Sequence, residues 1–216
     1  MTFFANFRKS ALELKNLRTL CVTAILIALD LVLKSVTIPI STDMKITFAF
    51  LALASIGMLF GPVVAFLAGT VTDILGMFIA QNMGAFNPMF TLVEATGAMI
   101  YGIFLYGLRF TRVDSLGGKF TDKNDVKQLL RIVLAKVVVV IVCNLIMTPF
   151  AITITNTMEA GTYKASVFWT GLWMRISKGL IKNVIQCPVD CVLLFAVLPI
   201  ILAAYNRVFK SRISAA

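Results

Sequence analysis

The chain has 216 residues, of which 59% are hydrophobic, and it carries a net charge of +10 without a single histidine. This composition excludes a soluble globular domain, because several apolar stretches approach the roughly 20 residues that a helix needs to cross a bilayer. It predicts an all-α, polytopic membrane protein with six transmembrane helices, at about residues 17–33, 46–60, 62–80, 90–108, 129–152 and 181–205.

Basic residues mark one side of the predicted membrane domain. Most of the 20 Lys and Arg residues fall in or beside the N-terminal tail 1–16, the connection 109–128 and the C-terminal tail 206–216. Since Lys and Arg are enriched in cytoplasmic segments, we expect both termini to be cytoplasmic and residues 1–216 to form a single membrane domain. The positive charge then faces anionic lipids, and nucleic acid is not an expected partner.

The first predicted span contains a signal for close helix packing. Ala24 and Ala28 are four residues apart in the segment AILIA, and two small residues at this spacing let another helix approach closely. Because the pair lies in the cytoplasmic half of the span, it is a candidate docking site for a membrane partner. Internal packing or chance is the alternative.

No catalytic or nucleotide-binding pattern accompanies the spans. The sequence has no GxSxG, HExxH or Walker-type GxxxxGK[ST] motif. An enzyme is therefore not expected, and nucleotide hydrolysis is not expected on this polypeptide. The four cysteines lie inside apolar stretches without CxxC spacing, so neither a metal nor another cofactor is predicted.

Ionisable residues inside the predicted spans are costly unless they face protein or a water-filled cavity. Asp30 lies in the first span, and Asp73 and Glu94 lie in the outer halves of the third and fourth. For Asp73 and Glu94 a ligand contact and an internal ion pair are both open. Lys136 either extends its ammonium group toward the interface or forms a buried pair with an acid such as Asp190.

The segment 175–190 (RISKGLIKNVIQCPVD) opens the last span with cations and amides. On a helix Arg175, Lys178 and Lys182 share one face, and Asn183 continues the polar track. A lipid-facing helix does not need such a stripe, so it predicts one wall of a site for an anionic ligand. Lys45 is expected on the same outer side.

The predicted outer connections add aromatic and amide groups. The connection 81–90 contains Phe86 and Asn87, and the longest one, 153–173, contains Trp169. Trp at this depth usually anchors a protein at the membrane surface; the alternative is that these groups close over a flat ring. Aromatic faces, amides and cations on one side suit a planar, anionic small molecule.

Several stretches resemble one known family. They are LRTLCVTAILIALDLVLK, KITFAFLALASIGMLFGPVVAFLAGTVTDILG, FNPMFTLVEATGAMIYGIFLYG and RISKGLIKNVIQCPVD. They are similar to the substrate-binding S component of energy-coupling factor (ECF) vitamin transporters, and in particular to its folate-specific (FolT) branch. The similarity extends over nearly the whole chain, and the GPxxxxxxGxxxDxxG and RxxKxxxKNxxxxPxD runs are its most specific part.

The resemblance implies a multi-pass protein of the prokaryotic plasma membrane. Such a protein binds folate or a related anionic vitamin from outside with high affinity, and delivers it with a transmembrane T component and two cytoplasmic ATPase subunits. Ala24 and Ala28 would match the motif that docks the T component. The surface around Gly61, Gly69 and Gly76 would be smooth enough to slide past that partner.

Folate also fits the candidate residues. Its pterin carries an N–H and an amino group that a carboxylate can accept together, and its glutamate tail carries two carboxylates. The pterin is expected at Asp73 or Glu94, with further ring contacts from Asn87, Asn183, Trp169 or Phe86. The expected partners of the two carboxylates are Lys45, Arg175, Lys178 or Lys182.

Two alternatives stay open. Another vitamin of the same transporter class, such as pantothenate or riboflavin, would use the same fold. A small membrane assembly protein without a ligand would pair its polar residues internally. In that case Asp73, Glu94, Lys178 and Lys182 would control stability instead of binding.

Overall fold

The computed structural model describes residues 3–41, 44–79, 87–108, 123–159 and 165–210, and they are mostly helical. One antiparallel hairpin follows the second helix, formed by β1 (Thr37–Ser41) and β2 (Met44–Thr47). The helices are α1 (Phe3–Glu13), α2 (Leu17–Ser35), α3 (Phe50–Phe60), α4 (Pro62–Ile79), α5 (Pro88–Leu105), α7 (Lys123–Val139), the π-helix η1 (Val140–Met147), α8 (Thr148–Glu159) and α9 (Ala165–Lys210). The predicted all-α class is confirmed, with the hairpin as an addition.

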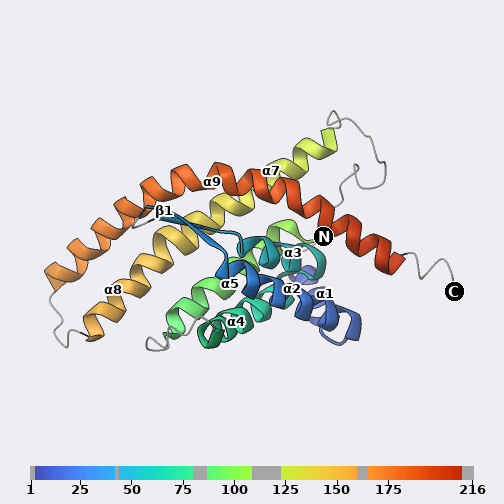
Figure 1. The fold of residues 1–216 in the computed structure, drawn as a ribbon, viewed down its shortest axis with the longest axis horizontal. Helices are drawn as coiled ribbons and strands as arrows, with labels where there is room; N and C mark the ends of the chain where they lie inside the picture. The colour runs from blue at the N-terminus through green and yellow to red at the C-terminus, as the bar shows by residue number, and fades with distance from the viewer. Residues whose placement is uncertain (1–2, 42–43, 80–86, 109–122, 160–164, 211–216) are drawn as a thin grey trace.

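The helices form two groups. In Figure 1 the long α9 runs beside the continuous α7–η1–α8 segment, and α1 to α5 gather against one half of this pair. Two apolar cores hold the groups together. One lies where α3 and α5 meet α7 and α9, and includes Leu51, Ile132 and Leu194. The other joins α2, α3 and α4, and includes Leu26 and Val64.

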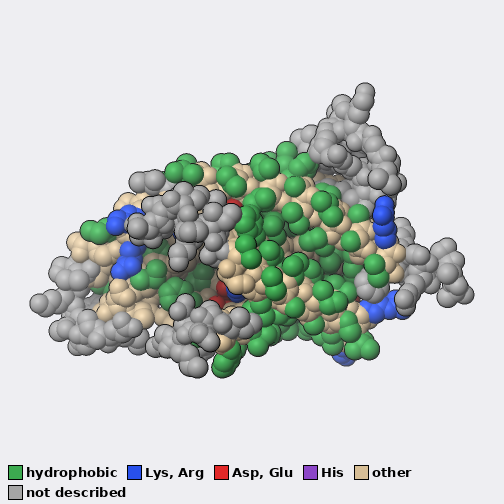
Figure 2. Space-filling view, in the orientation of Figure 1, with side chains coloured by type: hydrophobic (Ala, Val, Ile, Leu, Met, Phe, Trp, Pro, Cys, Tyr) green, Lys and Arg blue, Asp and Glu red, His purple; other side chains and the backbone are tan. Residues whose placement is uncertain are grey.

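Helix α3 is apolar on every side and is correspondingly enclosed by its neighbours. Ala52, Ala54 and Ile56 are at most 1% exposed. By contrast, large hydrophobic side chains of α2, α4, α7 and α9 point outward, and Figure 2 shows them as a broad apolar belt with Lys and Arg gathered toward its two ends. Such a belt is what a bilayer, not water, would surround.

Three helical segments are long and apolar enough to cross a membrane: Pro88–Leu105, Lys127–Thr157 and Lys182–Val208. A fourth candidate is α2 taken together with α1, which meet at an 88° bend. Phe50–Phe60 and Pro62–Phe78 are apolar but shorter. Length and composition thus support three or four spans in the described part of the chain.

The prediction of a long connection over 153–173 is wrong. Helix α8 continues to Glu159 and α9 already begins at Ala165, so Trp169 lies within a helix. The threonines of this segment are compatible with a helix. The hydroxyls of Thr153 and Thr157 donate to the carbonyls of Pro149 and Thr153, each four residues earlier. This bond satisfies the polar group without breaking the helix.

The glycines predicted to form a smooth sliding surface serve mainly inside the protein. Gly61, with φ of 88°, ends α3, and a Cβ there would lie 2.9 Å from the side chain of Ser10. A Cβ at Gly69 would lie 3.0 Å from the Ala95 Cα. At Gly76 the nearest atoms, from Leu31 and Lys34 side chains, are 3.8 Å away, which is ordinary contact. The prediction of a sliding surface is therefore wrong for Gly61 and Gly69, which are packed against other helices inside the protein.

Backbone meets backbone where α3, α4 and α5 converge. A Cβ on Gly102 would lie 2.5 Å from the Pro62 Cα, and a Cβ on Gly57 would lie 2.7 Å from the Gly102 nitrogen.

Gly102→Ala is expected to lower the free energy of unfolding by about 2 kcal/mol, because the overpacked atoms are backbone and cannot move aside. Thermal unfolding in detergent measures this. Gly171→Ala is the matched control, since nothing lies within 4 Å of its added methyl group; equal stability of the two variants would contradict the prediction.

Candidate functional site

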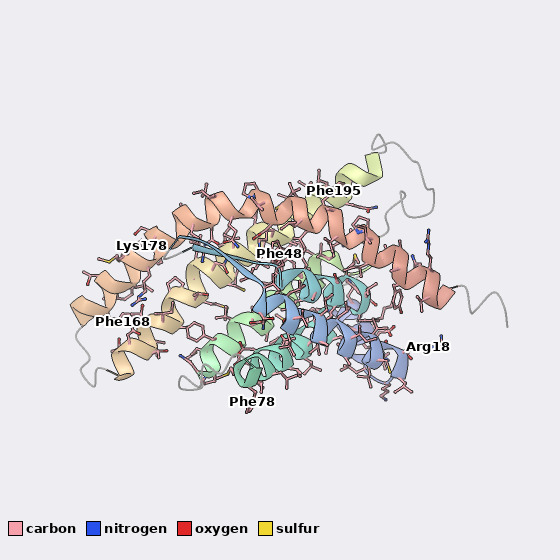
Figure 3. All side chains as sticks on the ribbon, in the orientation of Figure 1. Arg18, Phe48, Phe78, Phe168, Lys178 and Phe195 are labelled. Carbon is pink, nitrogen blue, oxygen red and sulfur yellow. The ribbon has the colours of Figure 1, made fainter. Side chains whose placement is uncertain are left out.

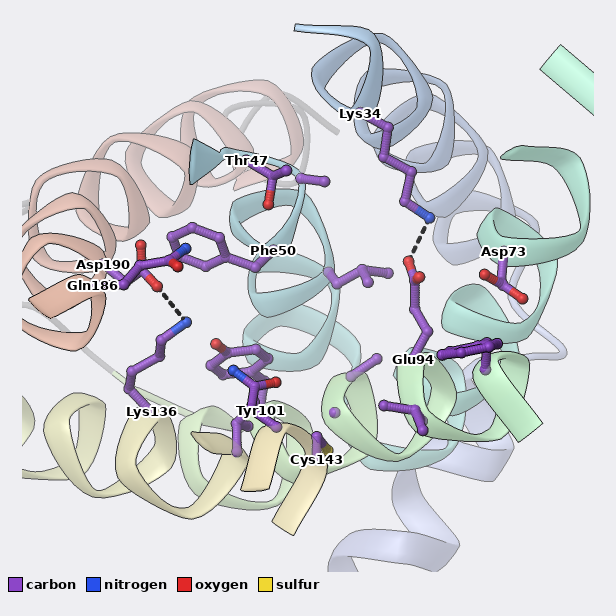
Figure 4. Close-up of a pocket in the computed structure, with 18 residues that line it drawn as sticks. Lys34, Thr47, Phe50, Asp73, Glu94, Tyr101, Lys136, Cys143, Gln186 and Asp190 are labelled. Atoms are coloured by element: carbon purple, nitrogen blue, oxygen red, sulfur yellow. Dashed lines mark hydrogen bonds and ion pairs between the residues drawn. The ribbon is translucent and has the colours of Figure 1, made fainter. Parts of the chain in front are cut away.

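Two adjoining cavities form the candidate site. The first, of about 570 Å³, is lined by Lys34, Asp73 and Glu94 on one side and by Lys136 and Asp190 on the other (Figure 4). The second, also of about 570 Å³, is lined by the predicted cationic stripe of α9. Both cavities include Thr47, Asn144 and Gln186 in their walls. The two cavities therefore make one elongated site with an acidic half and a basic half.

The acidic half is built by α2, α4 and α5. Thr91 donates a hydrogen bond to the Asp73 carboxylate, Oγ1 to Oδ2, at 2.6 Å. The Lys34 ammonium donates to Glu94 Oε1, as Figure 4 shows, and Thr72 Oγ1 lies 3.5 Å from the same oxygen. For Glu94 the predicted internal ion pair is confirmed, and the carboxylate also lines the cavity, so a ligand contact stays a prediction.

The Lys136–Asp190 ion pair lines the first cavity opposite Lys34 and Glu94 (Figure 4). Lys136 Nζ lies 2.7 Å from Asp190 Oδ2, and the two side chains are 7% and 3% exposed. The same ammonium lies 4.3 Å from the centre of the Phe50 ring, within range of a cation–π contact. The buried pair suggested by the sequence is confirmed, and it joins α7 to α9.

The basic half is carried by α9. Arg175, Lys178 and Lys182 line the second cavity, which confirms that they share a helix face. Lys178 lies on the part of α9 that runs beside α8 (Figure 3). Among the residues that the structure describes, none of these three cations forms an ion pair with a carboxylate. A cavity wall of unpaired cations is suited to an anion.

Amide groups sit where the two halves meet. Asn144, on η1, donates from Nδ2 to Asn183 Oδ1 at 2.8 Å, and Asn183 donates in turn to the Gly179 carbonyl at 2.8 Å. Arg175 is steadied by Asn156, whose amide oxygen, in the orientation that satisfies both ends of the amide, accepts from Nη2 at 2.8 Å. Asn183 is thus brought to the site as predicted, and its hydrogen bonds to Asn144 of η1 and to the Gly179 carbonyl of α9 fix its orientation.

Other predicted contact residues lie elsewhere. Asn87 caps α5, accepting from the Met89 nitrogen and donating to Thr155, so it joins α5 to α8. Trp169 is 56% exposed and is in the wall of neither cavity; its ring packs edge-on against Phe168. Phe86 and the side chain of Lys45 lie outside the described residues.

The sequence did not point to Lys34, Thr47 or Tyr101 as lining residues. Lys34 had one available signal, since it follows Asp30 by four residues and so shares a helix face with that acid. Its partner Glu94 is 60 positions away, which no local pattern reveals. Nearer the middle of α2, Ala24 and Ala28 are exposed.

With this geometry in view, the comparisons with known proteins assign the class. The sequence model of a family described as "ECF transporter, substrate-specific component" matches residues 18–204. The chain belongs to this family, whose members are transporter subunits embedded in membranes, not a class of enzymes.

Individual relatives give a narrower similarity. Over 198 residues the chain is 26% identical to "Folate transporter FolT" of Streptococcus mutans, covering 89% of this chain and 90% of that protein. It is 38% identical to "Folate transporter FolT" of Clostridium novyi over 96 residues, which are 43% of this chain and only about half, 54%, of that relative. A solved structure titled "Crystal structure of FolT bound with folic acid" is similar with a TM-score of 0.59 and 27% identity, covering 83% of this chain and 92% of that one.

Proposed function

We propose that this chain is the high-affinity folate-binding subunit of an ECF-type vitamin uptake transporter. The observation that carries the proposal is the adjoining acidic and basic halves of one elongated site. The pterin edge of folate donates two hydrogen bonds and suits Asp73 and Glu94, while its glutamate carboxylates suit Arg175, Lys178 and Lys182. Two FolT relatives and a folate-bound FolT structure support the same ligand.

The proposed function also implies a membrane topology and partner proteins. We infer that the chain crosses a prokaryotic cell membrane six times with both termini in the cytoplasm, so that the site faces outward. The bias of Lys and Arg supports this orientation. Delivery would then depend on a T component and two ATPase subunits, with exposed Ala24 and Ala28 on α2 as the docking face for the T component.

The ligand can be tested by titration calorimetry of the purified protein in detergent. Folate is expected to bind one molecule per chain with a Kd in the nanomolar range, about −12 kcal/mol. Pteroate, which lacks the glutamate, and p-aminobenzoylglutamate, which lacks the pterin, should each bind at least about tenfold more weakly, since each leaves one half of the site unfilled.

Pantothenate and riboflavin serve as controls in the same titration. Tighter binding of either than of folate would assign the subunit to another vitamin. A folded protein that binds none of the five compounds would support the membrane assembly protein and overturn the proposal.

A further inference from the structure

Asp30 is a buried carboxylate inside an otherwise apolar helix. Its side chain is 0% exposed, and it lies on α2 one turn before Lys34. Neither of its carboxylate oxygens has a hydrogen-bond partner in the described part of the chain. Such a group is costly to bury, so its place beside the site calls for a physical reason.

The ammonium group of Lys34 lies between two carboxylates. Its Nζ donates to Glu94 Oε1 and is also 3.4 Å from Asp30 Oδ2, within ion-pair distance. The two acids differ in position, because Glu94 lines the first cavity whereas Asp30 is not part of its wall. A ligand can therefore reach Glu94 but not Asp30.

A ligand that donates N–H groups to Glu94 competes with Lys34 for that carboxylate. If Lys34 lost its partner without a replacement, a mostly enclosed cation would be left unpaired, at a cost that would oppose binding. Asp30 removes this cost, since its carboxylate already lies within ion-pair distance of Lys34.

We propose that Lys34, which lies within ion-pair distance of both Glu94 and Asp30, gives up Glu94 when a ligand binds and keeps Asp30 as its partner. This inference rests on the proposed folate function and adds a specificity-determining role for two residues that need not touch the vitamin. A ring that lacks N–H donors cannot take over Glu94, so the Lys34–Glu94 ion pair keeps the acidic half closed to it.

The test measures folate and pteroate affinity in two variants. Asp30→Asn is expected to weaken binding of both compounds by the same factor, about tenfold or more, because Lys34 then keeps no charged partner once the ligand occupies Glu94. Adding Lys34→Met to that variant removes the cation that competes for Glu94. The double variant is expected to bind folate within about threefold of the unmodified protein, or more tightly.

Two controls separate this role from a structural one. Glu13→Gln removes a carboxylate on α1 that accepts from Thr19 outside the cavities, and should leave affinity unchanged. Arg175→Gln should weaken the binding of folate but not that of pteroate. This difference separates a loss of affinity at the basic half from a loss of affinity at the acidic half.

Three outcomes decide the matter. If Asp30→Asn binds folate as the unmodified protein does, or if the double variant stays as weak as the single one, the proposed role of Asp30 is wrong. Rescue by the double variant supports it, even if Asp30→Asn also lowers the unfolding temperature. If the unmodified protein does not bind folate, the proposed function fails first, and that result is visible before any variant is measured.

Discussion

Loss of one partner of the Lys136–Asp190 pair is expected to lower the free energy of unfolding by about 3–5 kcal/mol, which is typical of leaving a buried charge without its counter-ion. Both side chains are almost fully enclosed, at 7% and 3% exposed, so water solvates the group that remains only poorly. The variants are Asp190→Asn and Lys136→Met. The measurement is the unfolding transition in detergent without ligand, because a bound vitamin would stabilise the folded state and mask the difference.

The double variant Lys136→Met with Asp190→Leu makes this prediction specific. Replacing both members of a buried pair by apolar groups often costs little, so most of the lost stability should return. Lys178→Met is the matched control for the lysine, since Lys178 is exposed on α9 and has no carboxylate partner among the described residues. If the single variants were as stable as the unmodified protein, or if the double variant were as unstable as the single variants, the predicted role of this buried ion pair in stability would be contradicted.

The second large effect concerns the basic half of the site. Arg175→Gln combined with Lys178→Gln is expected to weaken folate binding by roughly 100-fold, since each hydrogen bond to a charged group contributes about 1.5–3 kcal/mol and solvent around the exposed Lys178 reduces the contribution of that lysine. The difference in folate affinity between the unmodified protein and the double variant should become smaller as the salt concentration is raised. Calorimetry or competition with labelled folate measures it.

Pteroate tests whether the loss comes from the glutamate contacts. Because it lacks both glutamate carboxylates, its affinity should change little in the same double variant. Arg207→Gln near the end of α9 is the matched control, since that arginine lines neither cavity. Intact folate affinity in the double variant would mean that the anion-binding wall lies elsewhere.

The sequence was sufficient to predict those features that depend on a local pattern of residues. The i, i+3 and i+7 spacing placed Arg175, Lys178 and Lys182 on one face, and the structure confirms that they line one cavity. Helix positions in the apolar stretches followed from composition in the same way. The buried lysine in the fifth predicted span could be matched with Asp190 because a charge at that depth requires a partner.

The rest depends on tertiary contacts. The hairpin over 37–47 and the continuation of α8 to Glu159 go against a simple loop prediction, since polar and β-branched residues occur in both loops and helices. The π-helix η1, which presents Asn144 to Asn183, has no sequence signal of its own. The pairing of Lys34 with Glu94 joins α2 to α5, and only the folded chain brings them together.

The contact of Gly57, Gly102 and Pro62 has a consequence for motion. Side chains can change rotamer to absorb a small displacement, but backbone atoms in direct contact cannot, so α3, α4 and α5 must move as one rigid body. Any hinge that widens the site for vitamin entry therefore lies outside this body, at α2, at the hairpin or along α8 and α9. The acids Asp73 and Glu94 lie on α4 and α5 and so belong to this rigid body, whereas the cations of the site lie on α9, outside it.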